Sequence, residues 1–260
     1  MIELNKIYNE DCLITMAKMP DNYIDLTITS PPYDNLRTYN GYTFDFQNIS
    51  KELYRVTKSG GVVVWIVGDA TIKGSETGTS FKQALYFKEC GFKLHDTIIY
   101  QKHTSSFPAK RNGNRYTQIF EYMFVFCKDR IKTANLICDK KNKTAGEPSR
   151  YGKYSYYNKE GVKIQQENKN KITPKYSPRN NIWKYKVGFD KIKGHPAIFP
   201  EQLVNDHIIS WSNENDLIYD CFMGSGTTGA VCSNLNRDFI GSEISKEYCK
   251  IAEQRIKKGL

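Results

Sequence analysis

The sequence of 260 residues lacks the features of a secreted or membrane-bound chain. It has no apolar run near the roughly 18 residues that a membrane-spanning helix needs. Its first residues do not combine a basic region with an apolar stretch, as a signal peptide would. The seven cysteines are odd in number and contain no CxxC pair. We therefore expect a cytoplasmic protein with reduced, mostly buried thiols and no disulfide framework.

Acidic side chains are scarce in one part of the chain. Residues 128–193 contain 18 Lys and Arg but only 6 Asp and Glu, whereas the rest contains 20 basic and 22 acidic residues. The net charge of +10 therefore belongs entirely to this segment. A local excess of positive charge indicates a polyanionic partner, most commonly nucleic acid, and a solvated lysine-rich loop is the alternative.

Outside this segment, apolar residues recur at strand and helix spacing. They predict strands at 25–29, 62–67, 94–100, 121–127, 217–220 and 239–240, and helices at 46–56, 81–90, 224–234 and 246–257. This alternation is typical of an α/β protein with a doubly wound, mainly parallel sheet. We therefore predict an α/β domain in two parts, residues 1–127 and 194–260, with a small inserted module at residues 128–193.

A glycine-rich loop at residues 220–229 lies between a predicted strand and a predicted helix. It contains the GxGxxG pattern, whose glycines let the backbone approach a nucleotide-like ligand. Glu243 ends the next predicted strand, where a carboxylate can accept hydrogen bonds from ribose hydroxyls. A nicotinamide-binding domain needs several βα units after this loop, but only 31 residues follow Gly229. The missing units must come from the earlier chain, which favours a permuted sheet over a dehydrogenase.

A rigid turn, Ser30-Pro31-Pro32-Tyr33, follows the predicted strand at 25–29. It presents the Ser30 hydroxyl, the Pro31 carbonyl and the Tyr33 ring. Two acceptors suit the two N–H bonds of an exocyclic amine, and the ring can stack on a base. Holding both protons would turn the nitrogen lone pair, otherwise conjugated into the base, toward a methyl donor. A proline turn that merely closes a loop is the alternative.

Together the two motifs resemble those of amino-group DNA methyltransferases that depend on S-adenosylmethionine, in the permuted β-class order. In that family the Ser/Asp-Pro-Pro-Tyr turn precedes the target-recognition region, and the Phe-x-Gly-x-Gly loop comes last. Cys221 stands where many members have proline. The matching stretches cover both α/β parts and are residues 9–12, 29–33, 60–65, 121–126, 195–200, 220–228 and 240–243.

The resemblance implies a Rossmann-like methyltransferase fold, S-adenosylmethionine as cofactor and double-stranded DNA as partner. The methyl group would go to the exocyclic amine of a flipped-out base. The serine before Pro-Pro-Tyr is similar to the cytosine-N4 members, and adenine-N6 methylation is the alternative. The target amine would be held by Ser30, Pro31, Pro32 and Tyr33. The cofactor would be bound by Asp11, Cys12, Pro196, Ala197, Phe199, Asp220, Phe222, Gly224, Ser225, Gly226, Thr227, Thr228 and Glu243.

The same resemblance implies a prokaryotic or phage origin and DNA marking, as in restriction-modification. A homodimer and a cognate restriction endonuclease are compatible partners. Outside the matching stretches, residues 151–157 and 110–115 interleave basic and aromatic or polar residues that could contact nucleic acid. An ordinary surface loop is the alternative for each of these two segments.

The four histidines, at 95, 103, 195 and 207, have no metal-ligand spacing, so we expect no metal. A histidine base is also unnecessary, because the amine can lose its proton after the methyl group has been transferred. Three other functions are considered: a dinucleotide-dependent oxidoreductase, methylation of a protein glutamine or an RNA adenine, and non-catalytic nucleic-acid binding. The motif order, the basic segment and the presence of both donor and acceptor motifs favour DNA methylation over all three.

Overall fold

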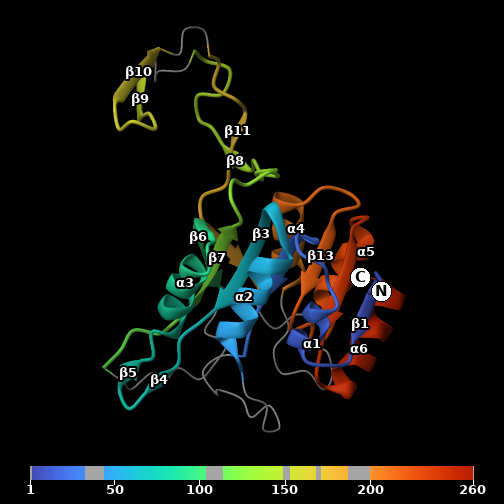
Figure 1. Cartoon of the computed structure of the whole chain (residues 1–260). Helices are drawn as coiled ribbons and strands as arrows, with labels where there is room; N and C mark the ends of the chain where they lie inside the picture. Colours follow the sequence, from blue (N-terminus) through green and yellow to red (C-terminus); the bar gives the residue numbers. More distant parts are fainter. Residues whose placement is uncertain are drawn as a thin grey trace. The chain divides into compact units, whose positions relative to one another are not determined.

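The computed structural model describes residues 2–32, 44–103, 114–148, 153–167, 171–186 and 200–259 (Figure 1). The chain forms two compact units. The first, Met1–Asn135 with Asn181–Leu260, is called the α/β unit below, and the second, Leu136–Asn180, the small unit. The small unit lies within the predicted insertion at 128–193 and is shorter at both ends.

An eight-stranded sheet forms the centre of the α/β unit, in the order β1-β14-β13-β2-β3-β7-β6-β12. Neighbouring strands are parallel, except that β7 is antiparallel to both β3 and β6. The predicted mainly parallel sheet is thus confirmed. The strands are β1 (Lys6–Tyr8), β2 (Ile24–Thr29), β3 (Thr57–Val67), β6 (Lys93–Lys102), β7 (Phe120–Cys127), β12 (Ile182–Tyr185), β13 (Leu217–Asp220) and β14 (Asp238–Ser242).

The sheet is permuted, as the position of the glycine loop predicted. β13 and β14, from the last part of the chain, lie between β1 and β2, from its beginning. Because all four strands are parallel, the segments that follow them meet at one edge of the sheet. This arrangement brings distant parts of the sequence to a common site.

Helices cover both faces of the sheet, which makes it doubly wound. The core on one face includes buried residues of α1 (Cys12–Ala17), α2 (Phe46–Val56) and α3 (Thr79–Glu89). The other core includes α4 (Glu201–Trp211), α5 (Thr227–Asn234) and α6 (Lys246–Lys258). β3 alternates between them, since Val64 packs into the second core and Trp65 into the first. Burial on both faces explains its continuous apolar run.

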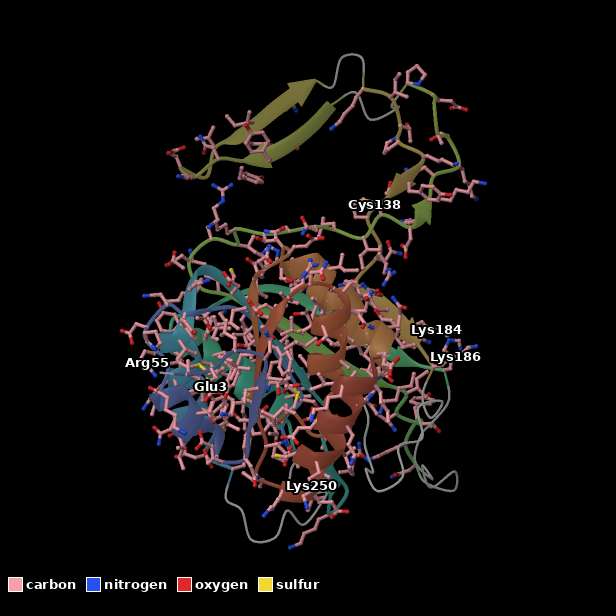
Figure 2. The ribbon with its side chains drawn as sticks, turned by 90° about the vertical axis from the view of Figure 1, so that its right-hand side faces the viewer. Glu3, Arg55, Cys138, Lys184, Lys186 and Lys250 are labelled. Atoms are coloured by element: carbon pink, nitrogen blue, oxygen red, sulfur yellow. The ribbon has the colours of Figure 1, made fainter. Side chains whose placement is uncertain are left out.

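The edge strand β12 lies inside the predicted insertion but belongs to the sheet. It pairs in parallel with β6, so that Tyr185 lies beside Lys102. Its side chains alternate: Trp183 and Tyr185 are buried, whereas Lys184 points outward (Figure 2). A segment that reads as polar on average can therefore still supply a strand to the core.

The small unit contains two antiparallel pairs and no helix among its described residues. β8 (Lys140–Lys141) pairs with β11 (Tyr176–Ser177), and β9 (Lys153–Tyr157) pairs with β10 (Lys163–Glu167). A further hairpin, β4 (Thr71–Ile72) with β5 (Ser75–Glu76), follows β3 in the α/β unit. No helix in the described part of the chain is long and apolar enough to cross a membrane. All seven cysteines are free and five are buried, as predicted.

Candidate functional site

The predicted site residues follow four neighbouring strands and lie at one edge of the sheet. Asp11 follows β1, Glu243 follows β14, the glycine loop follows β13, and Ser30 follows β2. The register places Tyr8 beside Ser242 and Asp220 beside Gly241, so these strands end at nearly the same level. Ligands of open parallel sheets bind beyond the carboxyl ends of the strands. This edge is therefore the candidate site.

Asp220 connects the end of β2 to the glycine loop. Its Oδ1 accepts hydrogen bonds from the Thr29 hydroxyl (2.7 Å) and the Phe222 N–H (3.1 Å), and its Oδ2 accepts one from the Thr228 hydroxyl (2.6 Å). The residue is buried, and burial raises the pKa of its carboxyl, while the bonds from Thr228, Thr29 and Phe222 oppose that rise. Its side chain is thus engaged within the protein and positions the two loops.

The glycine loop leads into α5 through backbone conformations that other residues rarely adopt. Gly224 and Gly226 have φ of 53° and 79°, in the left-handed region. A Cβ on Gly226 would lie 2.7 Å from the Cβ of Ala252 and 2.8 Å from its Cα. Gly226 is therefore required by the packing of α5 against α6, independently of any ligand.

Glu243 lies directly beside this loop. Its Oε2 accepts a hydrogen bond from the Gly224 N–H (2.9 Å) and its Oε1 one from the Ser245 N–H (2.8 Å). Burial raises the pKa of the half-buried carboxyl, and the bonds from Ser245 and Gly224 oppose the rise. Each oxygen has a second lone pair, so the carboxylate can still accept bonds from two vicinal hydroxyls.

The β1 side of the site contains Asp11 and Cys12. Asp11 caps α1, because its Oδ1 accepts a hydrogen bond from the Leu13 N–H at 2.7 Å. Cys12 is buried in the core, and its carbonyl accepts a bond from the Tyr219 hydroxyl at 3.4 Å. Of the two predicted residues, Asp11 is at the edge, whereas the Cys12 thiol is part of the interior.

Arg255, in the last turn of α6, is a site neighbour that the sequence did not reveal. Its Nη1 donates to the Thr227 hydroxyl at 2.7 Å and to the Ser225 hydroxyl at 3.4 Å, and its Nη2 binds the Glu201 carboxylate. The guanidinium joins the beginnings of α4 and α5. Arginine in the last turn of a helix is common, so only the tertiary contacts identify it.

The predicted acceptor turn is described in part. Ser30 and Pro32 are half-buried and Pro31 is buried. The ring of Phe222 lies 5.7 Å from that of Phe44 and 6.3 Å from that of Trp65, centroid to centroid. Four predicted site residues lie outside the described residues, namely Tyr33, Pro196, Ala197 and Phe199.

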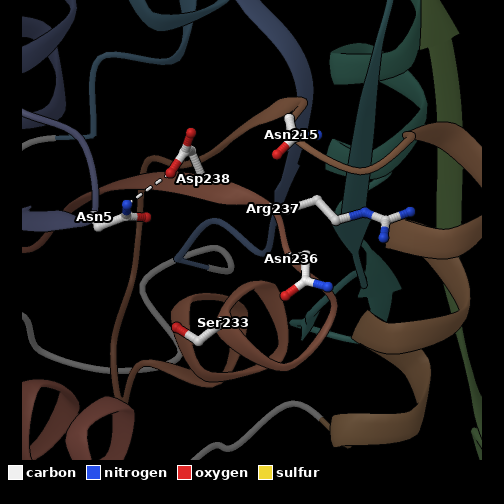
Figure 3. Close-up of a pocket in the computed structure, with 6 residues that line it drawn as sticks. All are labelled: Asn5, Asn215, Ser233, Asn236, Arg237 and Asp238. Carbon is white, nitrogen blue, oxygen red and sulfur yellow. Dashed lines mark hydrogen bonds between the residues drawn. The ribbon is translucent and has the colours of Figure 1, made fainter.

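Other candidate features lie away from this edge of the sheet or already have contacts within the protein. Of the basic segment 110–115, the described Arg115 contacts Glu76 on β5 at 3.5 Å. A polar pocket of about 320 Å³ lies beside Asp238, at the start of β14 and away from the loop edge (Figure 3). Its Arg237 already donates to the Leu235 and Ser212 carbonyls. The described residues contain no cluster of three His, Cys, Asp or Glu suited to a metal ion.

Comparison with known proteins agrees with this geometry. Residues 24–254 match the model of the N6/N4 methyltransferase family, described as DNA methylase. The orphan methyltransferase M.BamHII of Bacillus amyloliquefaciens is 56% identical over 243 residues, which cover 91% of this chain and 90% of that protein.

Two solved structures share the fold. The PvuII DNA methyltransferase, described as cytosine-N4-specific, has a TM-score of 0.70 and 21% identity, covering 95% of this chain and 84% of its own. A complex of M1.HpyAVI with SAM has a TM-score of 0.63 and 24% identity, covering 96% and 98%. The family match spans most of the sequence and includes both motif regions, and the chain therefore belongs to the N6/N4 family of DNA methylases that depend on S-adenosylmethionine.

Proposed function

We propose that the protein transfers the methyl group of S-adenosylmethionine to the exocyclic N4 of a flipped-out cytosine in double-stranded DNA. The observation that carries this proposal is the hydrogen bond from Thr29 to Asp220, which ties the strand before Ser30 to the loop at Gly224. It supports a donor site and an acceptor site that adjoin each other. Adenine N6 is the alternative acceptor.

The donor site would be composed of backbone and carboxylate groups. The loop from Gly224 to Gly226 would offer a backbone without bulky side chains, and Glu243 would offer acceptors for the two ribose hydroxyls. The buried side chains of Asp220 and Thr228 hold the loop in place by their mutual hydrogen bond. S-adenosylmethionine supplies a methyl group bound to a positively charged sulfur.

The acceptor turn would orient the amine. The Ser30 hydroxyl oxygen and the Pro31 carbonyl would accept its two N–H bonds, and the Tyr33 ring would stack on the base. This binding favours a tetrahedral nitrogen whose lone pair points at the methyl carbon. A nitrogen–carbon bond would form as the methyl carbon–sulfur bond breaks, and the amine would then release one proton to solvent. No side-chain base is required.

The choice of cytosine rests on Ser30, because serine before Pro-Pro-Tyr is similar to the cytosine-N4 members of the family. The test is direct: purified protein, S-adenosylmethionine and unmethylated duplex DNA are incubated, and the DNA is digested to nucleosides for mass spectrometry. N4-methylcytosine supports the proposal. N6-methyladenine would establish the alternative. If no methylated base is detected, DNA methylation itself is contradicted.

We also propose that the small unit recognises the DNA. It carries 11 Lys and Arg against 4 Asp and Glu. We expect the basic segment at 128–193 to make roughly 4–7 phosphate contacts. Each contact should make the slope of log affinity against log salt more negative by about 0.9. Replacing residues 136–180 by a short linker should remove sequence preference while the α/β unit still binds S-adenosylmethionine. Unchanged preference would identify the segment as a solvated loop.

The biological setting is DNA marking. We propose restriction-modification as the context, and marking without a partner nuclease is the alternative, since M.BamHII is named an orphan methyltransferase. A cognate restriction endonuclease and a homodimer are further proposals that rest on family resemblance. Light scattering of the purified protein tests whether it forms a homodimer.

A further inference from the structure

Among the described side chains of the β9–β10 ribbon, none is buried. Every residue from Ser155 to Val162 except Asn158 is exposed, with exposed fractions of 71% for Tyr157 and 56% for Val162. Its closing turn is nevertheless well defined. The Asn158 Oδ1 accepts hydrogen bonds from the N–H groups of Glu160 (3.1 Å) and Val162 (2.8 Å). The ribbon thus has a hydrogen-bonded closing turn and exposed side chains on both sides of it.

The two faces of the ribbon differ in chemistry. Tyr156 lies opposite Ile164, an aromatic–aliphatic pair on one face. The other face presents Ser155 opposite Gln165 and Tyr157 opposite Lys163, and all four side chains are exposed. This second face, called the Gln165 face below, combines a hydroxyl, an amide and an ammonium group in adjacent cross-strand pairs.

The charge of the small unit indicates which partner fits this face. An excess of seven positive charges over 45 residues favours a polyanion. The major groove of B-DNA admits a two-stranded β-ribbon, and base edges there are read by amide and hydroxyl side chains. Glutamine matches the N6 and N7 groups of adenine with two hydrogen bonds.

We propose that the β9–β10 ribbon enters the major groove of the target DNA with its Gln165 face. Gln165 reads an adenine, Ser155 contributes a second base or backbone contact, and Lys163 binds a phosphate. The inference rests on the proposed DNA methylation and adds a commitment: the recognition sequence contains an adenine read by Gln165.

The experiment compares recognition sequences in a host without other DNA methylation. The wild-type protein is expressed, and modification-sensitive sequencing of the host DNA defines its motif. Gln165→Ala should relax that motif at one A·T position by about 10- to 100-fold in discrimination while other positions keep their preference. Gln254→Ala, an exposed glutamine on α6, is the matched control and should leave the motif unchanged.

Lysine contacts are tested on duplex DNA that contains the wild-type motif. Lys163→Gln should reduce the magnitude of the negative slope of log affinity against log salt by about 0.9, as expected for one lost phosphate contact. Lys250→Gln, on the exposed surface of α6 (Figure 2), should leave the slope unchanged. Ser155 and Gln165 are exposed, so their replacement by alanine should not impair folding.

The outcomes separate this inference from the proposed function. If Gln165→Ala and Lys163→Gln retain the wild-type motif and slope, the ribbon does not read DNA, although the protein remains a methyltransferase. A wild-type motif without adenine would overturn the assignment of Gln165 in the same way. If the wild-type protein binds S-adenosylmethionine but methylates no DNA, the proposed function fails, and the ribbon inference fails with it.

Discussion

The Thr29 hydroxyl donates a hydrogen bond of 2.7 Å to the buried carboxylate of Asp220, 191 residues later in the chain. Thr29 is the residue before the acceptor turn, and Asp220 is the last residue of β13, where the glycine loop begins. This side-chain contact between two paired strands therefore links the two loops that are proposed to act together in methyl transfer.

Thr29→Val removes this donor without changing the shape of the side chain. Because the carboxylate loses a partner that lowers its pKa, we expect the pKa of Asp220 to rise further and unfolding free energy to fall by about 1–3 kcal/mol. Urea denaturation measures the second effect. Thr27→Val is the matched control, since the buried Thr27 hydroxyl has no hydrogen-bond partner among the described residues. An equal loss in both variants would show that the Thr29–Asp220 bond contributes nothing specific.

If Glu243 binds the cofactor as proposed, we expect the affinity for S-adenosylmethionine to depend on pH. Its pKa is raised by burial above the ordinary value of 4.5, so protonation begins at a higher pH than for an exposed glutamate. Because the pKa of Glu243 is higher in the folded than in the unfolded protein, this carboxyl stabilises the apo protein at a pH below its unfolded-state pKa. That stabilisation is lost as the pH rises through its folded-state pKa. Lowering the pH should therefore weaken S-adenosylmethionine binding. Protonation of Glu243 should not by itself destabilise the fold.

Calorimetry between about pH 8 and pH 5 tests this prediction. Wild-type affinity should decline toward the acid end, and Glu243→Gln should bind about 10- to 100-fold more weakly with little remaining pH dependence. Glu253→Gln, at an exposed position on α6, provides the comparison and should behave as wild type. A Glu243→Gln protein with wild-type affinity would remove Glu243 from the donor site.

Ser30 is predicted to act on the acceptor alone. Ser30→Ala removes one hydrogen-bond acceptor from the amine, so methyl transfer should slow by about 10- to 100-fold. Affinity for S-adenosylmethionine should remain unchanged, because the donor loop follows a different strand. Single-turnover kinetics with a radiolabelled methyl group measures the first quantity and calorimetry the second. Unaltered transfer would mean that the turn serves only to close a loop.

Gly226→Ala should impair folding rather than ligand access. Alanine at a φ of 79° is strained by about 1–2 kcal/mol, and its Cβ would be overpacked against the Ala252 backbone by about 1–3 kcal/mol more. Gly74 has a φ of 80°, and no atom of the described residues lies within 4 Å of the Cβ that Gly74→Ala would add, so only the strain applies there. Thermal unfolding of the two variants distinguishes the contributions. Equal loss at both positions would contradict the packing role of Gly226.

The sequence predicted most of the sheet because its signals are local. α2 was predicted with its observed bounds, since Phe46, Ile49, Leu53 and Val56 recur at helical spacing. Continuous β-branched residues likewise predicted the buried part of β3. α1, with six residues, is too short to show such a period.

α4 was missed for a different reason. Its buried residues include polar ones, and their partners come from distant strands: Asp206 accepts a bond from the Tyr185 hydroxyl at 2.7 Å, and His207 lies 3.2 Å from the Met123 sulfur. A sequence pattern cannot show that a polar side chain is satisfied by another strand. The candidate site has the same limit, because the Thr29–Asp220 bond and the contacts of Arg255 are made between distant parts of the chain.

The placement of β13 and β14 between β1 and β2 has a consequence for synthesis on the ribosome. β1 has no partner in the sheet, and β2 lacks one of its two neighbours, until residues 217–242 have also been made. Long-range pairing of this kind is slow to form, because the chain between the strands must first be brought together. The donor edge is therefore assembled last, and a nascent or prematurely terminated chain has an acceptor turn but no complete site from which a methyl group could be delivered.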